Sequence, residues 1–339
     1  MTPSRRPTLL SLPTLLSSAL SSVRGSALKT VLISGLLFSV PSWGHGDVYA
    51  VIAKSSTDIN FLAVQEGCQQ EAAKHKDSCE LLGPEGSANP RVQYQVLNNA
   101  VNDRRYAAIG LSVTRGDVLA KAAANATVPI ITFDSPFPAA MKHLAQAYVG
   151  PDNEDIGRVL GKLVTEYHPK GGQLCIMTAA ADTNLDNRVL GLRRQLSGNP
   201  DLVMGQRLRG ENGWSESLRC PWENSDDPER TMGQLKTTLQ DTSATVFVSV
   251  GSWPIVSPDD FRNLVSPYYD QLNERSLIIT TGVTTPEQRM LVNDGLVRAF
   301  VRIDFNGMGR QLYQLMRTAR ENPANVHDLI APVNIIRPL

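Results

Sequence analysis

The sequence lacks the motifs of several large enzyme classes. It contains no Gly-x-Ser-x-Gly nucleophile elbow, no glycine-rich phosphate loop and no His-Glu-x-x-His zinc motif. Only five residues are histidine and four are cysteine, with no Cys-x-x-Cys pair and no spacing typical of metal ligands. These absences argue against catalysis by an activated nucleophile, and we expect neither a metal nor a cofactor.

The chain also lacks an excess of charge of either sign. It has 33 Lys and Arg against 33 Asp and Glu. Residues 1–44 hold four of the bases and no acids, so the remainder carries 29 bases against 33 acids, or −4. A nucleic-acid partner usually requires a basic face, so this balance argues against one.

The N-terminal residues resemble a secretory signal. Arg24 and Lys29 precede an apolar run over 30–40, and small residues follow at 41–44. The run is too short for a membrane span of about 20 residues. We expect cleavage near Gly44 and a periplasmic mature protein; an uncleaved anchor helix is the alternative.

Export makes disulfides possible. Four cysteines allow three pairings. We favour Cys68–Cys79, which is local in the sequence, together with Cys175–Cys220 in the second half of the chain. These cysteines are expected to be structural.

Apolar runs alternate with amphipathic stretches along the rest of the chain, which predicts an α/β fold with parallel, doubly wound sheets. Helices are expected at 61–75, 92–102, 117–126, 154–166, 188–196, from 228, at 285–293 and 305–320. Strands are expected at 47–53, 79–82, 107–111, 128–133, 146–150, 173–178, 202–208, 244–249, 276–281, 297–303 and 330–336.

The elements fall into two units with no low-complexity linker between them. Ligands of open α/β sheets bind at the carboxyl ends of the strands. Asp134 directly follows the buried run Val128–Phe133, so we expect its carboxylate to face a cleft between the two units.

Several short motifs, in order, resemble the type I periplasmic binding proteins, the relatives of ribose-binding protein that serve ABC sugar importers. No single motif is strong, but together they cover about residues 47–339. They are Asp58-Ile-Asn60-Phe61, Pro129-Ile-Ile-Thr-Phe-Asp134-Ser135, Tyr148-Val-Gly-Pro151-Asp-Asn153, Asn184-Leu-Asp-Asn-Arg188, Gly251-Ser-Trp253-Pro254 and Val292-Asn-Asp294-Gly295.

The resemblance implies two lobes that close on a ligand by motion about a three-segment hinge. The crossings would fall near 150–152, near 303–305 and before Ile330. We expect residues 1–44 to be the signal peptide, 45–151 plus 304–328 the N-terminal lobe, and 152–303 plus 329–339 the C-terminal lobe.

The resemblance also implies the ligand-binding residues. Asp134 would accept ligand hydroxyls and Arg188 would donate to them from the other lobe. Helix capping is the alternative for Asp58 and Asn60, and core packing for Phe61 and Trp253. One of Trp214 and Trp222 is a further candidate for the cleft. The predicted set is Asp58, Asn60, Phe61, Ser112, Asp134, Ser135, Asn184, Arg188 and Trp253.

The chain departs from the family pattern at three positions. Val283 stands where the family has an acid, Ile303 where it has a hinge glutamine, and Pro151 where it has Ser or Thr. Asp304 or Thr281 is a candidate substitute for the missing groups. The loss of acceptors favours a deoxy sugar, a more apolar polyol or a small anion over a plain pentose.

We therefore expect a monomeric periplasmic protein that binds a carbohydrate-like ligand and delivers it to an ABC permease. The alternative within this class is a ligand sensor that signals to a membrane sensor kinase or chemoreceptor. An exported enzyme is a second class, in which Asp58, Asp134 and Asp182 would supply paired carboxylates for glycoside hydrolysis. A repressor would need a DNA-binding helix pair before the first strand, where the signal segment stands.

Overall fold

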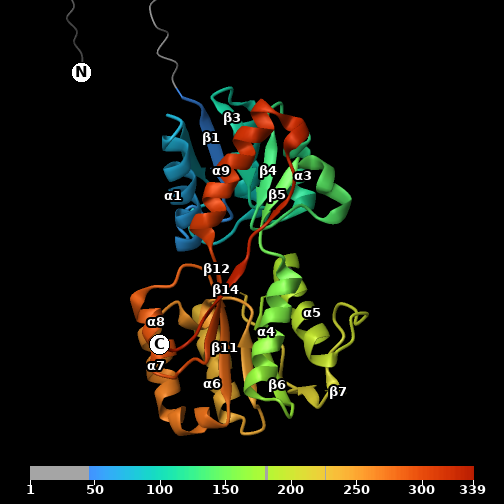
Figure 1. Cartoon of the computed structure of the whole chain (residues 1–339), viewed down its shortest axis with the longest axis vertical. Helices are drawn as coiled ribbons and strands as arrows, with labels where there is room; N and C mark the ends of the chain where they lie inside the picture. Colours follow the sequence, from blue (N-terminus) through green and yellow to red (C-terminus); the bar gives the residue numbers. More distant parts are fainter. Residues whose placement is uncertain (1–45, 180–181, 226) are drawn as a thin grey trace, which may run out of the picture. The chain divides into compact units, whose positions relative to one another are not determined.

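A computed structural model describes residues 46–179, 182–225 and 227–339 (Figure 1). The predicted signal peptide and its cleavage point lie outside these residues. The described part has two lobes, each built on its own largely parallel sheet with helices against both faces, as the sequence predicts. None of the helices within these ranges combines the length and apolar character needed to cross a membrane.

The first sheet has six parallel strands in the order β13-β5-β4-β3-β1-β2. Its strands are β1 (Val48–Ile52), β2 (Ser78–Leu82), β3 (Tyr106–Leu111), β4 (Ile130–Phe133), β5 (Ala147–Gly150) and β13 (Leu329–Ile330). Its helices are α1 (Ile59–Ala73), α2 (Pro90–Asn102), α3 (Gly116–Ala123) and α9 (Phe305–Glu321), with the 3₁₀ turns η1 (Ala139–Leu144) and η4 (Pro323–Asn325).

Side chains of β1 alternate between two cores, because successive strand residues point to opposite faces. Tyr49 and Val51 belong to the core that also contains α1 and α9, whereas Ala50 and Ile52 belong to the core under α2 and α3. Both faces are therefore covered, which explains why the buried strands are continuously apolar.

The second sheet runs β14-β12-β11-β10-β6-β8-β7, and β9 also pairs with β6. Its strands are β6 (Gly172–Thr178), β7 (Arg209–Glu211), β8 (Trp214–Glu216), β9 (Trp222–Glu223), β10 (Val246–Ser249), β11 (Ser276–Thr281), β12 (Ala299–Ile303) and β14 (Val333–Ile336). Its helices are α4 (Asn153–Tyr167), α5 (Thr183–Ser197), α6 (Pro228–Gln240), α7 (Pro258–Val265) and α8 (Pro286–Asn293), with η2 (Trp253–Ile255) and η3 (Ser266–Asn273).

Two predicted strands are wrong. Residues 202–208 contain a turn at 204–205 and no strand, and short strands instead lie within 209–223, where we expected no regular structure. The expected closing strand 330–336 is two strands in two sheets: β13 pairs with β5, and β14 pairs antiparallel with β12. The third crossing between the sheets therefore follows Ile330. Helix α7 was not predicted, although Ser257 caps it and Pro258 is its first residue.

Both predicted disulfides are confirmed. Cys68–Cys79 joins α1 to β2, and Cys175–Cys220 joins β6 to the segment before β9.

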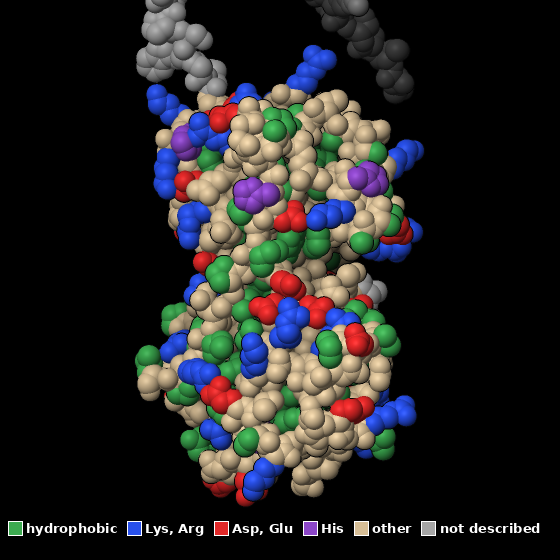
Figure 2. All heavy atoms as spheres, turned by 45° about the vertical axis from the view of Figure 1, so that its right-hand side comes forward, with side chains coloured by type: hydrophobic (Ala, Val, Ile, Leu, Met, Phe, Trp, Pro, Cys, Tyr) green, Lys and Arg blue, Asp and Glu red, His purple; other side chains and the backbone are tan. Residues whose placement is uncertain are grey.

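Acidic and basic side chains are interspersed on the face seen in Figure 2. On the second lobe, for example, Arg158 lies among Asp152, Glu154 and Asp155 at the start of α4.

Candidate ligand-binding cleft

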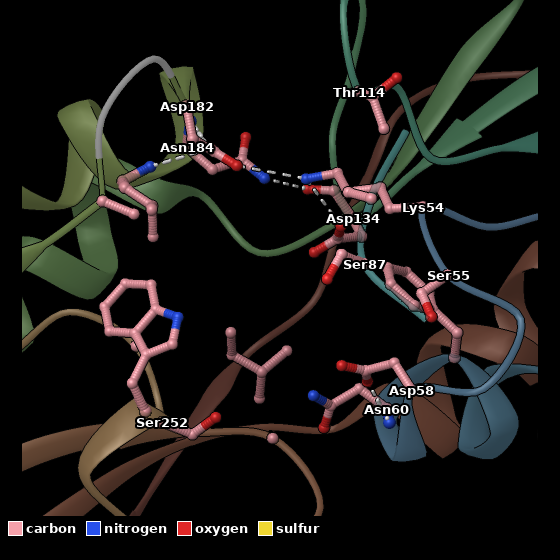
Figure 3. Close-up of a pocket in the computed structure, with 18 of the residues that line it drawn as sticks. Lys54, Ser55, Asp58, Asn60, Ser87, Thr114, Asp134, Asp182, Asn184 and Ser252 are labelled. Carbon is pink, nitrogen blue, oxygen red and sulfur yellow. Dashed lines mark hydrogen bonds and ion pairs between the residues drawn. The ribbon is translucent and has the colours of Figure 1, made fainter. Parts of the chain in front are cut away.

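A cavity of about 770 Å³ lies between the lobes, where the carboxyl ends of strands from both sheets meet (Figure 3). This is the location at which open α/β sheets bind small molecules. The first lobe contributes the loops after β1, β2, β3 and β4, and the second contributes the segments after β6 and β10 and the ends of β11 and β12. Its polar lining residues include Lys54, Ser55, Asp58, Asn60, Ser87, Thr114, Asp134, Asp182, Asn184, Arg188, Ser252, Thr280 and Thr281.

Lys54 connects the two walls of this cleft. It lies two residues after the buried end of β1, and its ammonium Nζ lies 3.5 Å from Asp134 Oδ2 and 3.5 Å from Asp182 Oδ2. Burial opposes the charged ammonium, but the two carboxylates outweigh burial and raise the pKa of Lys54. Lys54 therefore stays charged at neutral pH and bridges an acid of each lobe.

Asp134 has an unusual backbone conformation, with φ of +57°. Asp tolerates this left-handed region better than most residues. Its Oδ2 accepts a hydrogen bond from the Ser112 hydroxyl at 2.9 Å. Its main-chain oxygen accepts from the Tyr148 hydroxyl at 3.1 Å and, across the cleft, from Asn184 Nδ2 at 3.0 Å. The carboxylate is thus held in place at the first lobe's wall.

Arg188 of α5 is buried and held on two sides. Its Nε donates to Asn153 Oδ1 and its Nη1 to the Val250 carbonyl, both at 2.8 Å. Burial lowers the pKa of Arg188, although the charges of Asp134 and Asp182 oppose this. An arginine nevertheless remains charged at neutral pH, so the cleft contains a rigidly placed guanidinium.

The position of Arg188 depends on close contact between α4 and α5. A Cβ added at Gly157 would lie 2.1 Å from the Arg188 carbonyl oxygen, and one at Gly191 would lie 2.0 Å from the Glu154 carbonyl oxygen. Only glycine lets the two backbones approach this closely. The spacing of these glycines therefore determines where the guanidinium enters the cleft.

Asp182 precedes α5 and caps it, accepting hydrogen bonds from the Asn184 and Leu185 amides at 2.8 and 3.3 Å. Burial alone would raise the pKa of this carboxyl, but Lys54 and Arg188 lower it overall. Asp182 is therefore ionised, and the four central charged groups comprise two cations and two anions.

Asp58 and Asn60 line the cleft and also have structural roles. Asp58 caps α1, because its Oδ1 accepts from the Asn60 amide at 2.8 Å. Asn60 Oδ1 accepts from the Val283 amide of the second lobe at 2.9 Å. Gly282 makes this contact possible, since a Cβ there would collide with the Asn60 side chain. Asp58 therefore has the capping role that the sequence left open, whereas Asn60 contacts the second lobe instead of capping a helix, and both residues line the cavity.

The two aromatic candidates, Phe61 and Trp253, both line the cavity, and Phe61 also packs against other aromatic rings. Phe61 is buried edge-on between Phe133 and Phe305, with ring centroids 6.2 and 6.3 Å apart. It lines the cavity, but these packing contacts account for most of its surroundings. Trp253 also lines the cavity, at the start of η2.

Several sequence candidates lie elsewhere. Ser112 and Ser135 do not line the cavity. The Ser112 hydroxyl instead donates a hydrogen bond to the Asp134 carboxylate. Trp214 is buried in β8, and Trp222 donates its indole N–H to Thr238, so neither reaches the cleft. Of the proposed substitutes for the family's missing acceptors, Thr281 lines the cavity, whereas Asp304 caps α9.

Sequence reasoning missed Lys54 and Thr280 as site residues and considered Asp182 only for an enzyme. Each lies within two residues of the end of a strand or the start of a helix, and this position is the signal that the sequence offers. What the sequence does not show is that the loops after β1 and β6 approach one another closely enough for Lys54 to contact Asp182.

Comparison with solved structures supports this architecture. A solute-binding protein from Burkholderia graminis, described in complex with D-arabinose, matches with a TM-score of 0.70 and 17% identity over 86% of this chain and 95% of that one. A glucose-galactose binding protein from Geobacillus stearothermophilus matches with a TM-score of 0.70 and 16% identity, covering 86% and 97%. A solute-binding protein from Agrobacterium vitis with bound D-fucose gives 0.70 and 17%, covering 86% and 95%.

These identities establish a shared fold. No significant match to a curated protein sequence was found. The model of one protein family, described as a periplasmic binding protein domain, matches residues 49–322. The chain therefore belongs to the periplasmic binding protein family.

Proposed function

We propose that this protein captures a sugar or similar small polar molecule in the cleft between its lobes and delivers it to an ABC importer. The observation that carries this proposal is the pair of opposed polar walls, with Asp134 on the first lobe and Arg188 on the second. A carboxylate accepts from sugar hydroxyls and a guanidinium donates to them, so a ligand held by both joins the lobes. The sugars named for the similar solved structures are consistent with this ligand class.

We also propose that the two lobes close on the ligand by moving about the three chain segments that join them. These segments follow β5, β12 and β13. The two lobes then act as domains that move relative to one another, and the ligand stabilises the closed arrangement. Binding requires no bond to be broken, so the ligand leaves the cleft chemically unchanged.

We further propose that the chain is exported, with cleavage after Gly44, and acts as a monomer in the periplasm. Protein purified from the periplasmic fraction of expressing cells would then begin at His45 by N-terminal sequencing. An N-terminus at Met1 would contradict cleavage.

Thermal shift with a panel of sugars and polyols tests the proposed function, since a ligand of the folded state raises Tm. We expect at least one neutral sugar to raise Tm and to be recovered intact by mass spectrometry. Chemical conversion of that sugar would instead indicate an enzyme.

Deletion of the gene tests the partner. Loss of uptake of the sugar would support the importer, whereas retained uptake with a lost transcriptional or chemotactic response would indicate a sensor.

A further inference from the structure

One glycine of the second lobe lies directly against the first lobe. Gly282 follows β11 and is buried, and a Cβ added to it would lie 2.0 Å from Asn60 Oδ1 and 2.7 Å from Phe305 Cε2. Asn60 and Phe305 belong to α1 and α9, which pack on the first sheet. The other glycines of the described residues have open space at this position or would meet atoms of their own lobe. A side chain at 282 would therefore collide with the opposite lobe.

A hydrogen bond joins the lobes at the same place. The Val283 N–H donates to Asn60 Oδ1 at 2.9 Å. An N–H group can only donate, so the Asn60 amide must present its oxygen to Val283 and cannot rotate without breaking this bond. The bond favours the approach of the lobes, and the bare backbone of Gly282 determines how closely they come together.

Two further contacts join the lobes at the start of α5. Asn184 Nδ2 donates to the Asp134 main-chain oxygen at 3.0 Å, and Lys54 Nζ lies 3.5 Å from Asp182 Oδ2. All the donors and acceptors of these contacts are groups of the protein, so none of the contacts requires a ligand. Of the three places, the one at Gly282 is the place that a single methyl group would block.

We propose that Asn60 and Gly282 form a closure contact, which sets how closely the lobes approach and holds them together whether or not a ligand is bound. Asn60 is then a positioning residue, because it acts on ligand affinity through the arrangement of the lobes and not through a bond to the ligand. A contact that favours the closed arrangement raises the fraction of molecules competent to hold a ligand and so lowers the measured Kd. This effect on affinity rests on the proposed function, whereas the effect on closure does not.

Gly282→Ala tests the contact by placing a methyl group between the lobes. Small-angle X-ray scattering of the sugar-free protein should give a larger radius of gyration than that of the wild type, because the lobes are held apart. The sugar-free Tm should stay close to that of the wild type, since separation of the lobes relieves the collision. The sugar titrated by calorimetry is whichever of D-arabinose, D-fucose, D-galactose and D-glucose raises the wild-type Tm most, and its Kd should rise about 10- to 100-fold.

Gly67→Ala is the matched control. A Cβ at Gly67 would also lie 2.0 Å from an oxygen, the Asn306 carbonyl, but these two residues belong to α1 and α9 within the first lobe. This variant should lower the sugar-free Tm and leave the radius of gyration unchanged, because separation of the lobes does not relieve its collision. The same pair of results for Gly282→Ala would overturn the proposal.

Asn60→Ala distinguishes a closure contact from a ligand contact. Loss of the hydrogen bond from Val283 should enlarge the sugar-free radius of gyration and raise the Kd about 2- to 10-fold. Asn60→Asp keeps an acceptor oxygen and should retain the wild-type radius. A raised Kd with an unchanged radius in Asn60→Ala would show that Asn60 only binds the ligand, which would overturn its role in closure.

The double variant Asn60→Ala/Gly282→Ala tests whether the two residues act on each other. It removes the nearest neighbour of the new methyl group and leaves the Phe305 ring at 2.7 Å. Its radius of gyration should return toward that of Asn60→Ala, and a radius as large as that of Gly282→Ala would overturn the role of Asn60. If none of the four sugars raises Tm, the proposed function fails, but the scattering experiments need no ligand and still decide this proposal.

Discussion

The ammonium of Lys54 lies 3.5 Å from the carboxylate of Asp182, and the two residues belong to different lobes. The same ammonium is 3.5 Å from Asp134 in its own lobe. One side chain therefore connects the first lobe's proposed ligand acceptor to the capping residue of the second lobe's α5. This connection leads to the first of five predictions.

Lys54→Met should lower the free energy of unfolding by about 3 kcal/mol, because it leaves the buried Asp134 carboxylate without its cation. Urea unfolding measures this loss. Lys162→Met on the exposed face of α4 is the control and should stay within about 0.5 kcal/mol of the wild type. Equal effects of the two substitutions would show that the bridge contributes nothing.

Asp134→Asn should abolish the Tm increase produced by a bound sugar while the sugar-free protein stays folded. Asparagine also tolerates the positive φ of this position, so the backbone is preserved while the charge is lost. Alanine would confound the result with backbone strain. Asp155→Asn on the exposed part of α4 serves as control, and an unchanged sugar affinity in Asp134→Asn would remove Asp134 from the site.

Gly157→Ala should destabilise the protein and weaken sugar binding together, since the new methyl group would collide with the Arg188 carbonyl in α5. We expect a loss of about 3 kcal/mol from overpacking. Gly233→Ala is the matched control, because it lies in α6 with open space around its Cβ position. That substitution should stabilise the protein by about 0.5–1 kcal/mol.

The two disulfides should contribute unequally. The crosslinked residues are 11 apart for Cys68–Cys79 and 45 apart for Cys175–Cys220. Loop-closure entropy then predicts losses of about 3 and about 4 kcal/mol when each pair is replaced by alanine. Urea unfolding of the two double variants tests this order, and a larger loss from the shorter loop would contradict it.

His168 should make stability fall as pH drops below about 6.5. Its ring lies 2.8 Å from the Ser276 hydroxyl, and burial, together with Arg298, lowers its pKa from the usual value near 6.5. The unfolded state then binds more protons, so the contribution is present above pH 6.5 and is lost as pH falls through the lowered pKa. His168→Gln should flatten the pH profile of Tm, and the exposed His143→Gln should not.

Much of this organisation could be predicted from the sequence where it depends on local pattern. Buried strands ending in polar residues, such as the run that leads to Asp134, and the order of short motifs predicted both lobes and part of the cavity lining, including Asp134 and Arg188. The cysteine pairs could be predicted as well. The strand expected at 202–208 failed because Val203 and Met204 are exposed and Gly205 has a positive φ, which a short apolar run does not reveal.

The remaining features depend on contacts between distant segments. Whether Ser112 faces the cleft or lies beneath Asp134 depends on the side-chain direction at one strand end. The contact of Lys54 with Asp182 depends on how two loops from different sheets approach.

The chain crosses between its sheets after β5, after β12 and after β13. The two walls of the cleft are therefore always presented to each other at a high effective concentration that does not change on dilution. Closure is an intramolecular equilibrium, so a measured sugar affinity should be the same at nanomolar and micromolar protein. Contacts such as Lys54–Asp182 connect the two lobes, so they would bias the open and closed populations and thereby change the measured affinity.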